Sequence, residues 1–456
     1  MQEAGEQFEK LLRDLFQVGV KVAQPDLKFQ QYWETVGKPW LDRVAPLRKN
    51  VWVFGAGKAT AAMAAALESV IADSESLKGF VVTRRGYGVN TRRIRVVEAA
   101  HPVPDEDGQR AAKKMLGDLS QVPPGDAVIA LISGGGSSLL SVPVRGVPFV
   151  DLQQLNRALL SSGAPIDEMN VVRKHLTQTL GGQMAMFCSA PVCQVLISDV
   201  PGDDPSLIAS GPFSPDDSTF EQATAVIKRW AIQVPHTVQR YLDRGCRGEV
   251  PETPGSNSKV FSKVTTHMLA SCAMSLQAVS ERLEQEGYKV LNLGDSVEGE
   301  ARDVARVLSA IVHQAAQGKG GWPAPPLALL SGGECTVSMS EATMRQARGG
   351  RNSEFLLALS FYLRDLSCDV PLAAMAADTD GTDGVGGHAG ALLLPGDLDR
   401  AIEEGLAPQR HLDQHTSYDY FDALGRLLVT GPTATNVNDL RVILIGQPQA
   451  PEQTET

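Results

Sequence analysis

Apolar residues follow two different spacings along the chain, and their alternation predicts a repeating order of strands and helices. Between Phe8 and Phe16 the apolar residues recur at helical spacing, which predicts an amphipathic helix. An alanine-rich stretch at 59–70 predicts another helix, and a third is expected after the 101–108 segment HPVPDEDG. Short apolar runs bounded by turn residues predict buried strands at 51–54, 80–83, 94–97, 127–132 and 193–197. This order favours a parallel sheet with helices on both faces.

The same pattern restarts after a segment rich in proline, glycine and serine at 249–258, which we interpret as a linker. The spacing beyond it predicts helices near 266–286, at 301–317 and at 354–364, and strands at 288–293, 327–330 and 441–445. We therefore expect two α/β domains, residues 1–255 and 256–445, each a largely parallel sheet flanked by helices. Residues 446–456 are expected to form a disordered tail.

Composition narrows the class of protein. The 456 residues carry a net charge of −11, which argues against non-specific binding to nucleic acid or to anionic membranes. No apolar stretch is long enough to cross a membrane, and the mixed-charge N-terminus lacks a signal core. The six cysteines form no CxxC pair, so we expect reduced thiols. A cytoplasmic enzyme is the expectation.

Glycine turns follow several predicted strands and raise the question of what comes close to the backbone there. Ser133-Gly-Gly-Gly136 ends one strand, and residues 331–333 repeat the Ser-Gly-Gly pattern in the second half of the chain. Further glycine turns lie at 55–57 and 349–350. Such turns offer backbone N–H groups to phosphate, and ligands of open α/β sheets bind at the carboxyl ends of strands. For any single loop the alternative is a tight turn without a ligand.

Charged residues next to these turns are candidates for anion binding. Lys58 and Arg351 each follow two glycines at the start of a predicted helix and can bind phosphate or carboxylate. Arg173 belongs to a basic cluster at 170–175, which is equally well explained as a solvated helix face.

Acidic turns suggest a hard cation. Asp378, Asp380 and Asp383 are interleaved with glycines, a pattern suited to Mg²⁺, although the spacing is not that of an EF-hand. Asp199 follows another predicted strand and can hold a metal or orient a hydroxyl. Asn436 lies in a polar turn before the last strand and can reach a ligand there.

Taken in order, these loops resemble the glycerate 2-kinases whose C-terminal half is called the MOFRL domain. The matching stretches span residues 50 to 445 and are FGAGKA, HPVPDEDG, LISGGGSSLL, the N-x-V-R-K-H segment, ISDVPGDDPSLIASGP, SGGE, GGRNSE, DTDGTDG and TGPTATNVND. The resemblance implies a Rossmann-like N-terminal domain, a MOFRL-type C-terminal domain and an active site in the cleft between them. It also implies ATP-dependent phosphorylation of the 2-hydroxyl of D-glycerate, which gives 2-phosphoglycerate.

The resemblance and the residues together yield a set of expected roles. Lys58 and Arg351 match the family's active-site lysine and arginine, and Asp199 is expected to orient the 2-hydroxyl as a general base or through the metal. The cofactors are ATP and Mg²⁺, the latter on Asp378, Asp380 and Asp383. The partners are D-glycerate and ATP, with no nucleic acid or membrane, and a homo-oligomer stays open. The expected substrate- or nucleotide-binding residues are Gly55, Gly57, Ser133, Gly134, Gly135, Gly136, Ser137, Arg173, Gly332, Gly333, Glu334, Asn352 and Asn436.

Three alternatives remain at this point. An NADP-dependent hydroxypyruvate reductase is favoured by Gly55-x-Gly57 after a strand, but Thr60 occupies the third glycine position of a dinucleotide fingerprint. A ligand sensor without catalysis would not need the charged loops. A kinase acting on another 2-hydroxy acid would use the same residues.

Overall fold

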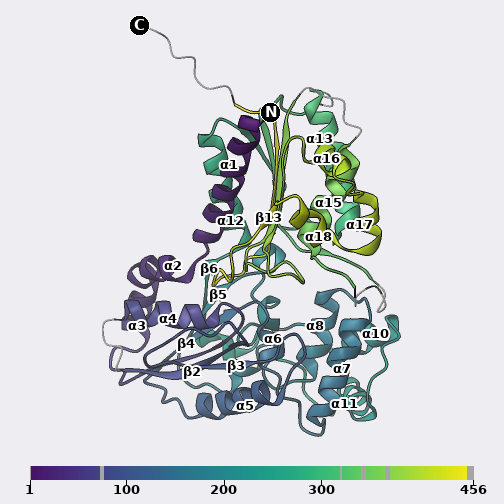
Figure 1. Cartoon of the computed structure of the whole chain (residues 1–456). Coiled ribbons are helices and arrows are strands. Elements are labelled where there is room, and N and C mark those ends of the chain that lie inside the picture. The colour runs from purple at the N-terminus through teal and green to yellow at the C-terminus, as the bar shows by residue number, and fades with distance from the viewer. Residues whose placement is uncertain are drawn as a thin grey trace. The chain divides into compact units, whose positions relative to one another are not determined.

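The computed structural model describes residues 2–71, 76–318, 321–339, 343, 346–364 and 370–448 (Figure 1). Contacts divide the chain into two compact units: Pro25–Ala270, and Met1–Gln24 together with Ser271–Thr456. No helix among the described residues is long and apolar enough to cross a membrane. Five of the six cysteines are described, and none of these five forms a disulfide.

The unit Pro25–Ala270 is built on a six-stranded sheet in which every pairing is parallel. The strand order is β3-β2-β1-β4-β5-β6, the order of doubly wound dinucleotide-binding sheets. β4 and β5 are buried at every position, as expected for strands covered by helices on both faces. The strands are β1 Val51–Ala56, β2 Leu77–Arg84, β3 Arg95–Ala99, β4 Ala127–Ser133, β5 Val192–Ile197 and β6 Val264–Ala270.

The helices of this unit divide between the sheet and a separate apolar core. α7, α8, α10 and α11 pack on one another around side chains such as Leu155, Val172 and Ile227. α10 starts with a capping box between Thr219 and Gln222. The helices are α2 Pro25–Tyr32, α3 Lys38–Val44, α4 Thr60–Val70, α5 Glu106–Ser120, α6 Gly136–Leu139, α7 Phe149–Ser161, α8 Ile166–His175, α9 Gln183–Met186, α10 Phe220–Arg229 and α11 His236–Cys246. A π-helical turn, η1 Trp33–Gly37, joins α2 to α3, and 3₁₀ turns occur at η3 Pro201–Asp203, η4 Ile208–Ser210 and η5 Lys259–Lys263.

The second unit has a six-stranded sheet in the order β13-β12-β11-β14-β9-β7. Alternate residues of β9 enter two cores: Leu329 packs with α13 and α15, whereas Leu330 packs with α1 and α12. Helices therefore cover both faces of this sheet (Figure 1). Its strands are β7 Lys289–Asn292, β9 Leu327–Ser331, β11 Leu372–Asp378, β12 Gly390–Leu393, β13 Leu427–Leu428 and β14 Asp439–Ile445, beside the short pair β8 Gly299–Glu300 and β10 Cys335–Thr336. Its helices are α1 Gln2–Lys21, α12 Cys272–Gln285, α13 Ala301–Ala316, α15 Arg351–Leu363, α16 Asp397–Glu403, α17 Pro408–Gln414 and α18 Ser417–Ala423.

The second sheet corrects the expectation of two largely parallel sheets. β7 and β9 pair in parallel, but the other four pairings are antiparallel. β11 and β12 are joined by residues 379–389 without a crossover helix, and such a connection is open to antiparallel strands alone.

The units also differ in extent from the expected domains. Residues 266–270, expected to begin a helix near 266–286, belong instead to β6 (Val264–Ala270), the last strand of the first sheet. The helix α1 belongs with the second unit, where it packs on α12. Of the expected tail, residues 449–456 lie outside the described residues.

Candidate functional site

Two glycine turns meet at the carboxyl edge of the first sheet. β1 and β4 are neighbours, and the later strands of the order extend away from them in opposite directions. This switch point is where open α/β sheets bind their ligands. The turn after β1 comes so close to the end of β4 that a Cβ on Gly57 would lie 2.2 Å from Oγ of Ser133.

The turn after β1 uses its own N–H groups internally. Gly57 donates to the carbonyl of Val82 at 3.1 Å, and Lys58 donates to that of Gly134 at 2.9 Å. Ala59 donates to Oγ of Ser133 at 3.0 Å. The turn therefore offers none of these three backbone donors to a ligand.

The turn after β4 has the opposite character. The ladder with β5 runs to the pair Ser133 and Ile197 and so directs the N–H of Gly134 to the Ile197 carbonyl, whereas no acceptor among the described residues bonds the backbone N–H groups of Gly135 and Gly136. Gly135 has a φ of +79°, a left-handed conformation that glycine adopts without strain. Two adjacent donors without a protein partner are suited to binding an anion.

Side chains from four other segments occupy the space that this turn leaves by having no side chains of its own. A Cβ on Gly134 would lie 1.6 Å from Oδ2 of Asp199, which follows β5. A Cβ on Gly135 would meet Nε2 of His101 at 3.1 Å and Cγ of Lys58 at 3.4 Å. On Gly136 it would meet the Ala209 methyl group at 2.6 Å. The protein's own functional groups, rather than a ligand alone, thus explain why glycine is needed here.

The Ala209 segment is strained and touches the turn a second time. Ala209 and Ser210 have φ of +50° and +55°, which non-glycine residues rarely adopt. Ser210 is fully buried, and its Oγ lies 2.8 Å from Oγ of Ser137. The strained pair thereby holds the hydroxyl that follows the glycine turn.

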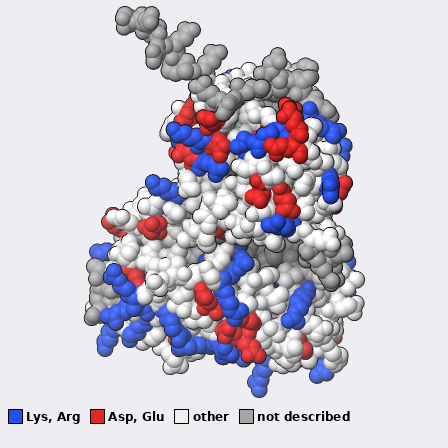
Figure 2. Space-filling view, viewed as in Figure 1, with Lys and Arg blue, Asp and Glu red and all other residues white. Residues whose placement is uncertain are grey.

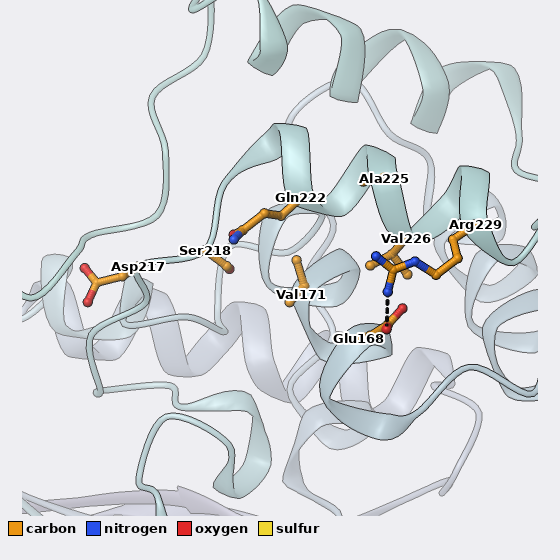
Figure 3. A pocket seen from close by; sticks show the side chains of 8 residues that line it. All are labelled: Glu168, Val171, Asp217, Ser218, Gln222, Ala225, Val226 and Arg229. Atoms are coloured by element: carbon orange, nitrogen blue, oxygen red, sulfur yellow. Dashed lines mark hydrogen bonds and ion pairs between the residues drawn. The ribbon is translucent and has the colours of Figure 1, made fainter.

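Other side chains of this unit lie apart from the turn. Arg173 is buried at the C-terminal end of α8. A pocket of about 490 Å³ lies between α8 and α10 (Figure 3), and none of the predicted site residues lines it. Its walls include Glu168, Val171, Ser218, Gln222 and Arg229.

In the second unit Arg351 is surrounded by carboxylates. Its Nε donates to both oxygens of Asp439 at 3.0 Å, one Nη donates to Asp378 at 2.7 Å, and the other lies 3.0 Å from Glu334. Burial alone would lower the pKa of Arg351, but the charges of Asp439, Asp378 and Glu334 outweigh it and hold the pKa well above its ordinary value. The guanidinium is therefore always charged, and its surroundings carry excess negative charge.

The three acids expected to bind metal have separate roles here. Asp383 accepts the backbone N–H groups of Asn352 and Ser353, both at 2.9 Å, and so caps α15. Asp378 accepts the N–H of Asp380 at 2.9 Å within the turn that follows β11. Among the described residues, no three His, Cys, Asp or Glu side chains gather as a metal-holding group.

The Ser331-Gly-Gly333 turn also differs from its counterpart in the first unit. Arg441 donates to the carbonyl of Gly332 at 2.7 Å, and the N–H of Gly332 donates to Gly294 at 2.9 Å. Asn352 donates to Asp439 at 2.7 Å. Asn436 is buried near the start of β14. The turn therefore positions Arg441 instead of presenting donors.

Three residues at these sites were not singled out from sequence. His101 and Ser210 belong to the quoted stretches HPVPDEDG and ISDVPGDDPSLIASGP, so their place in a motif was the available signal. Asp439 opens β14 and binds both Arg351 and Arg441 with a fully buried side chain. It is the last residue of the quoted stretch TGPTATNVND, so its place in a motif was again the available signal.

Charge is unevenly distributed over the molecular surface. On the face drawn in Figure 2, basic side chains gather over the first unit around β2, β3 and α5. Acidic and basic side chains are interspersed over the second unit (Figure 2). The unit that holds the open glycine turn is therefore also the one whose drawn face is richer in cations.

Comparison with known proteins identifies two matching families. Residues 11–243 match the family described as "Domain of unknown function (DUF4147)", and residues 327–439 match the MOFRL family. A protein of Agrobacterium vitis whose name proposes a hydroxypyruvate reductase is 46% identical over 86% of this chain and 87% of its own length.

Relatives named as kinases match over similar lengths. The glycerate 2-kinase of Pyrococcus horikoshii is 36% identical over 88% of both chains. The crystal structure of the glycerate kinase of Thermotoga maritima superposes with a TM-score of 0.81 at 32% identity, covering 96% of this chain and all of the other. The chain belongs to the glycerate 2-kinase family, whose C-terminal part is the MOFRL domain.

Proposed function

We propose that this protein transfers the γ-phosphoryl group of ATP to the 2-hydroxyl of D-glycerate and releases 2-phosphoglycerate and ADP. The observation that carries the proposal is the turn Ser133–Gly136, in which the adjacent N–H groups of Gly135 and Gly136 lack a protein acceptor among the described residues. Phosphoryl transfer needs positioned donors and cations more than covalent chemistry. Lys58, beside the same turn, supplies a cation. The relatives named as glycerate 2-kinases add support.

In the proposed step Asp199 is the proton acceptor. The oxygen of the 2-hydroxyl attacks the γ-phosphorus, the new O–P bond forms, and the bond to the β,γ-bridging oxygen breaks so that ADP leaves. The hydroxyl proton passes to the Asp199 carboxylate, which lies directly against Gly134. The backbone N–H groups and Lys58 would stabilise the negative charge on the phosphoryl oxygens.

Magnesium is proposed to enter with ATP. Mg²⁺ usually takes one or two protein carboxylates together with phosphate oxygens and water, so a three-acid cluster is not required. Asp378 and Asp380 fit this role as buried carboxylates in one turn, whereas Asp383 is committed to capping α15. When bound, the ion would neutralise charge on the phosphates.

Arg351 is proposed to neutralise a substrate anion. Because its nitrogens already contact three carboxylates, an incoming anion must displace one of them. Glu334 is the most exposed of the three, with 49% of its side chain accessible, and is the partner that would be displaced.

The second candidate function is an NADP-dependent hydroxypyruvate reductase, favoured by the name of the Agrobacterium vitis relative. Dinucleotide-binding loops use the N–H groups of the turn after the first strand for the pyrophosphate. Here Gly57, Lys58 and Ala59 donate to protein acceptors instead. This observation favours the kinase.

A paired assay tests the proposal. Purified protein is incubated with Mg-ATP and D-glycerate and followed by ³¹P NMR, which separates the 2-phosphate ester from the 3-phosphate ester. A parallel sample contains NADPH and hydroxypyruvate and is followed by nicotinamide absorbance. We expect 2-phosphoglycerate in the first sample and unchanged NADPH in the second. Oxidation of NADPH without a phosphate ester would replace the kinase with the reductase.

A further inference from the structure

Three consecutive basic residues at the end of α8 differ in their partners. Lys174 lies 3.2 Å from Asp216, and both side chains are buried. Nε2 of His175 lies 3.0 Å from Glu252. Arg173 is also buried, with 8% exposed, but none of the described acidic side chains forms an ion pair with it. The fold thus places a carboxylate beside two of these three side chains and no described carboxylate beside the third.

The contacts of Arg173 are neutral and leave much of its guanidinium unused. Nε donates to Oδ1 of Asn156 and Nη1 donates to Oδ1 of Asn170, both at 3.1 Å. A guanidinium has five N–H groups, so three remain. Two of the three belong to Nη2, which is not among the buried side-chain atoms of the described residues that lack a hydrogen-bond partner, so this nitrogen borders accessible space.

Burying the charged Arg173 side chain without a counter-ion costs free energy. Burial lowers the pKa of Arg173 to about 10, because the charged form loses hydration without gaining a counter-ion. Buried charges in proteins are normally paired, and an apolar side chain of similar volume is often at least as stable. A residue required for packing alone would therefore not need this charge.

The position of Arg173 connects it to the open glycine turn. α8 packs against η4 (Ile208–Ser210), and Ser210 bonds Ser137 at the end of the turn. The chain leaving α8 continues along residues 142–144, because Leu176 accepts the N–H of Val144 and Gln178 donates to Val142. The helix that carries Arg173 is therefore linked to the turn through η4, although the Arg173 side chain itself bonds Asn156 and Asn170.

We propose that Arg173 binds an oxyanion of a substrate through the unused side of its guanidinium. The planar fork of N–H groups matches a carboxylate or a phosphate. The proposal rests on the proposed function, in which D-glycerate supplies the carboxylate and ATP supplies the phosphate. The guanidinium would bind the carboxylate and the phosphate through the same N–H groups, and the experiment distinguishes the two anions.

The experiment uses the full chain and the variants Arg173→Met, Arg173→Lys and Arg157→Met. Arg157 is an exposed residue of α7 next to Asn156 and controls for the loss of one positive charge. Binding of D-glycerate and of a non-hydrolysable Mg-ATP analogue is measured separately by calorimetry, and the melting temperature is measured without ligand.

We expect Arg173→Met to melt at the wild-type temperature or above it and to bind one of the two ligands at least tenfold more weakly. Loss of D-glycerate binding assigns the site to the carboxylate, and loss of the nucleotide analogue assigns it to phosphate. Wild-type affinity for both ligands would overturn the proposal. If Arg173→Met fails to fold, Arg173→Lys decides, because it keeps the charge but loses the planar fork: weaker binding of one ligand supports the proposal, and unchanged binding overturns it.

The two proposals fail in different ways. If the wild-type protein makes no 2-phosphoglycerate, the proposed function fails, while calorimetry still reports whether Arg173 binds either anion. If the wild type makes 2-phosphoglycerate and Arg173→Met binds both ligands normally, only the Arg173 proposal fails.

Discussion

Gly134 and Asp199 compete for the same space, so adding one methyl group at Gly134 tests the geometry of the turn. An ideal Cβ on Gly134 would lie 1.6 Å from Oδ2 of Asp199 and 2.1 Å from its Cγ. Non-bonded heavy atoms are most stable at about 3.5–4.0 Å, so Gly134→Ala requires a displacement of roughly 1.5–2 Å. Unlike Gly135, Gly134 has no left-handed backbone, and the effect is therefore steric.

The expected magnitudes follow from this displacement. Overpacking of a dense interior costs about 1–3 kcal/mol. For a unit of this size each kcal/mol lowers the melting temperature by about 2–4 °C. A catalytic group misplaced by about 1 Å loses roughly 100-fold in rate. We therefore expect Gly134→Ala to melt several degrees lower and to lose about 100-fold in kcat/KM.

Differential scanning fluorimetry and a coupled assay of ADP release measure the two effects. Gly117→Ala is the control, because a Cβ there meets nothing within 4 Å and its site in α5 favours alanine by about 0.5–1 kcal/mol. Asp199→Ala in the Gly134→Ala background should restore the melting temperature but not the activity. A Gly134→Ala protein with wild-type stability and activity would refute the packing of Asp199 on the turn.

Three further predictions test contacts on both units. Ser210→Ala removes a buried hydroxyl contact worth about 1 kcal/mol and should lower kcat/KM about fivefold in the same assay, whereas Ser214→Ala, whose hydroxyl bonds Gln194 instead, should stay near wild type. Asp439→Asn leaves the buried Arg441 and the partly buried Arg351 short of a counter-charge and should lower the free energy of unfolding in urea by about 3–5 kcal/mol. Burial alone would raise the pKa of Asp383, but contacts with His388 and with the N–H groups that it caps lower it below 3.8. The ionised Asp383 carboxylate therefore stabilises the fold fully above its unfolded pKa, and this contribution is lost as pH falls through the lower pKa of the folded state. Urea titrations should show that Asp383→Asn loses less stability below about pH 4 than the wild type does.

Much of the first sheet could be predicted from the sequence, because buried parallel strands appear there as short apolar runs bounded by turn residues. The runs at 51–54 and 127–132 became β1 and β4, and the glycines after them mark the carboxyl edge. The segment 264–270 was harder, because β6 is an edge strand with half-buried and exposed positions and its apolar spacing does not differ clearly from that of the helix that follows. Strand direction in the second sheet could not be predicted, since it depends on pairing between β14 and strands distant in sequence.

Residue types and motif order by themselves determined the family and predicted an anion site. Glycines, a lysine and an aspartate at strand ends are local features, and they predict an anion site without knowledge of any contact. Only the tertiary structure decided which turn keeps its N–H groups available. It also decided that Asp383 caps a helix and that Arg173 lacks a carboxylate. The physical reason is that hydrogen-bond partners and counter-charges come from segments far apart in the chain, and their distances are set by packing rather than by local sequence.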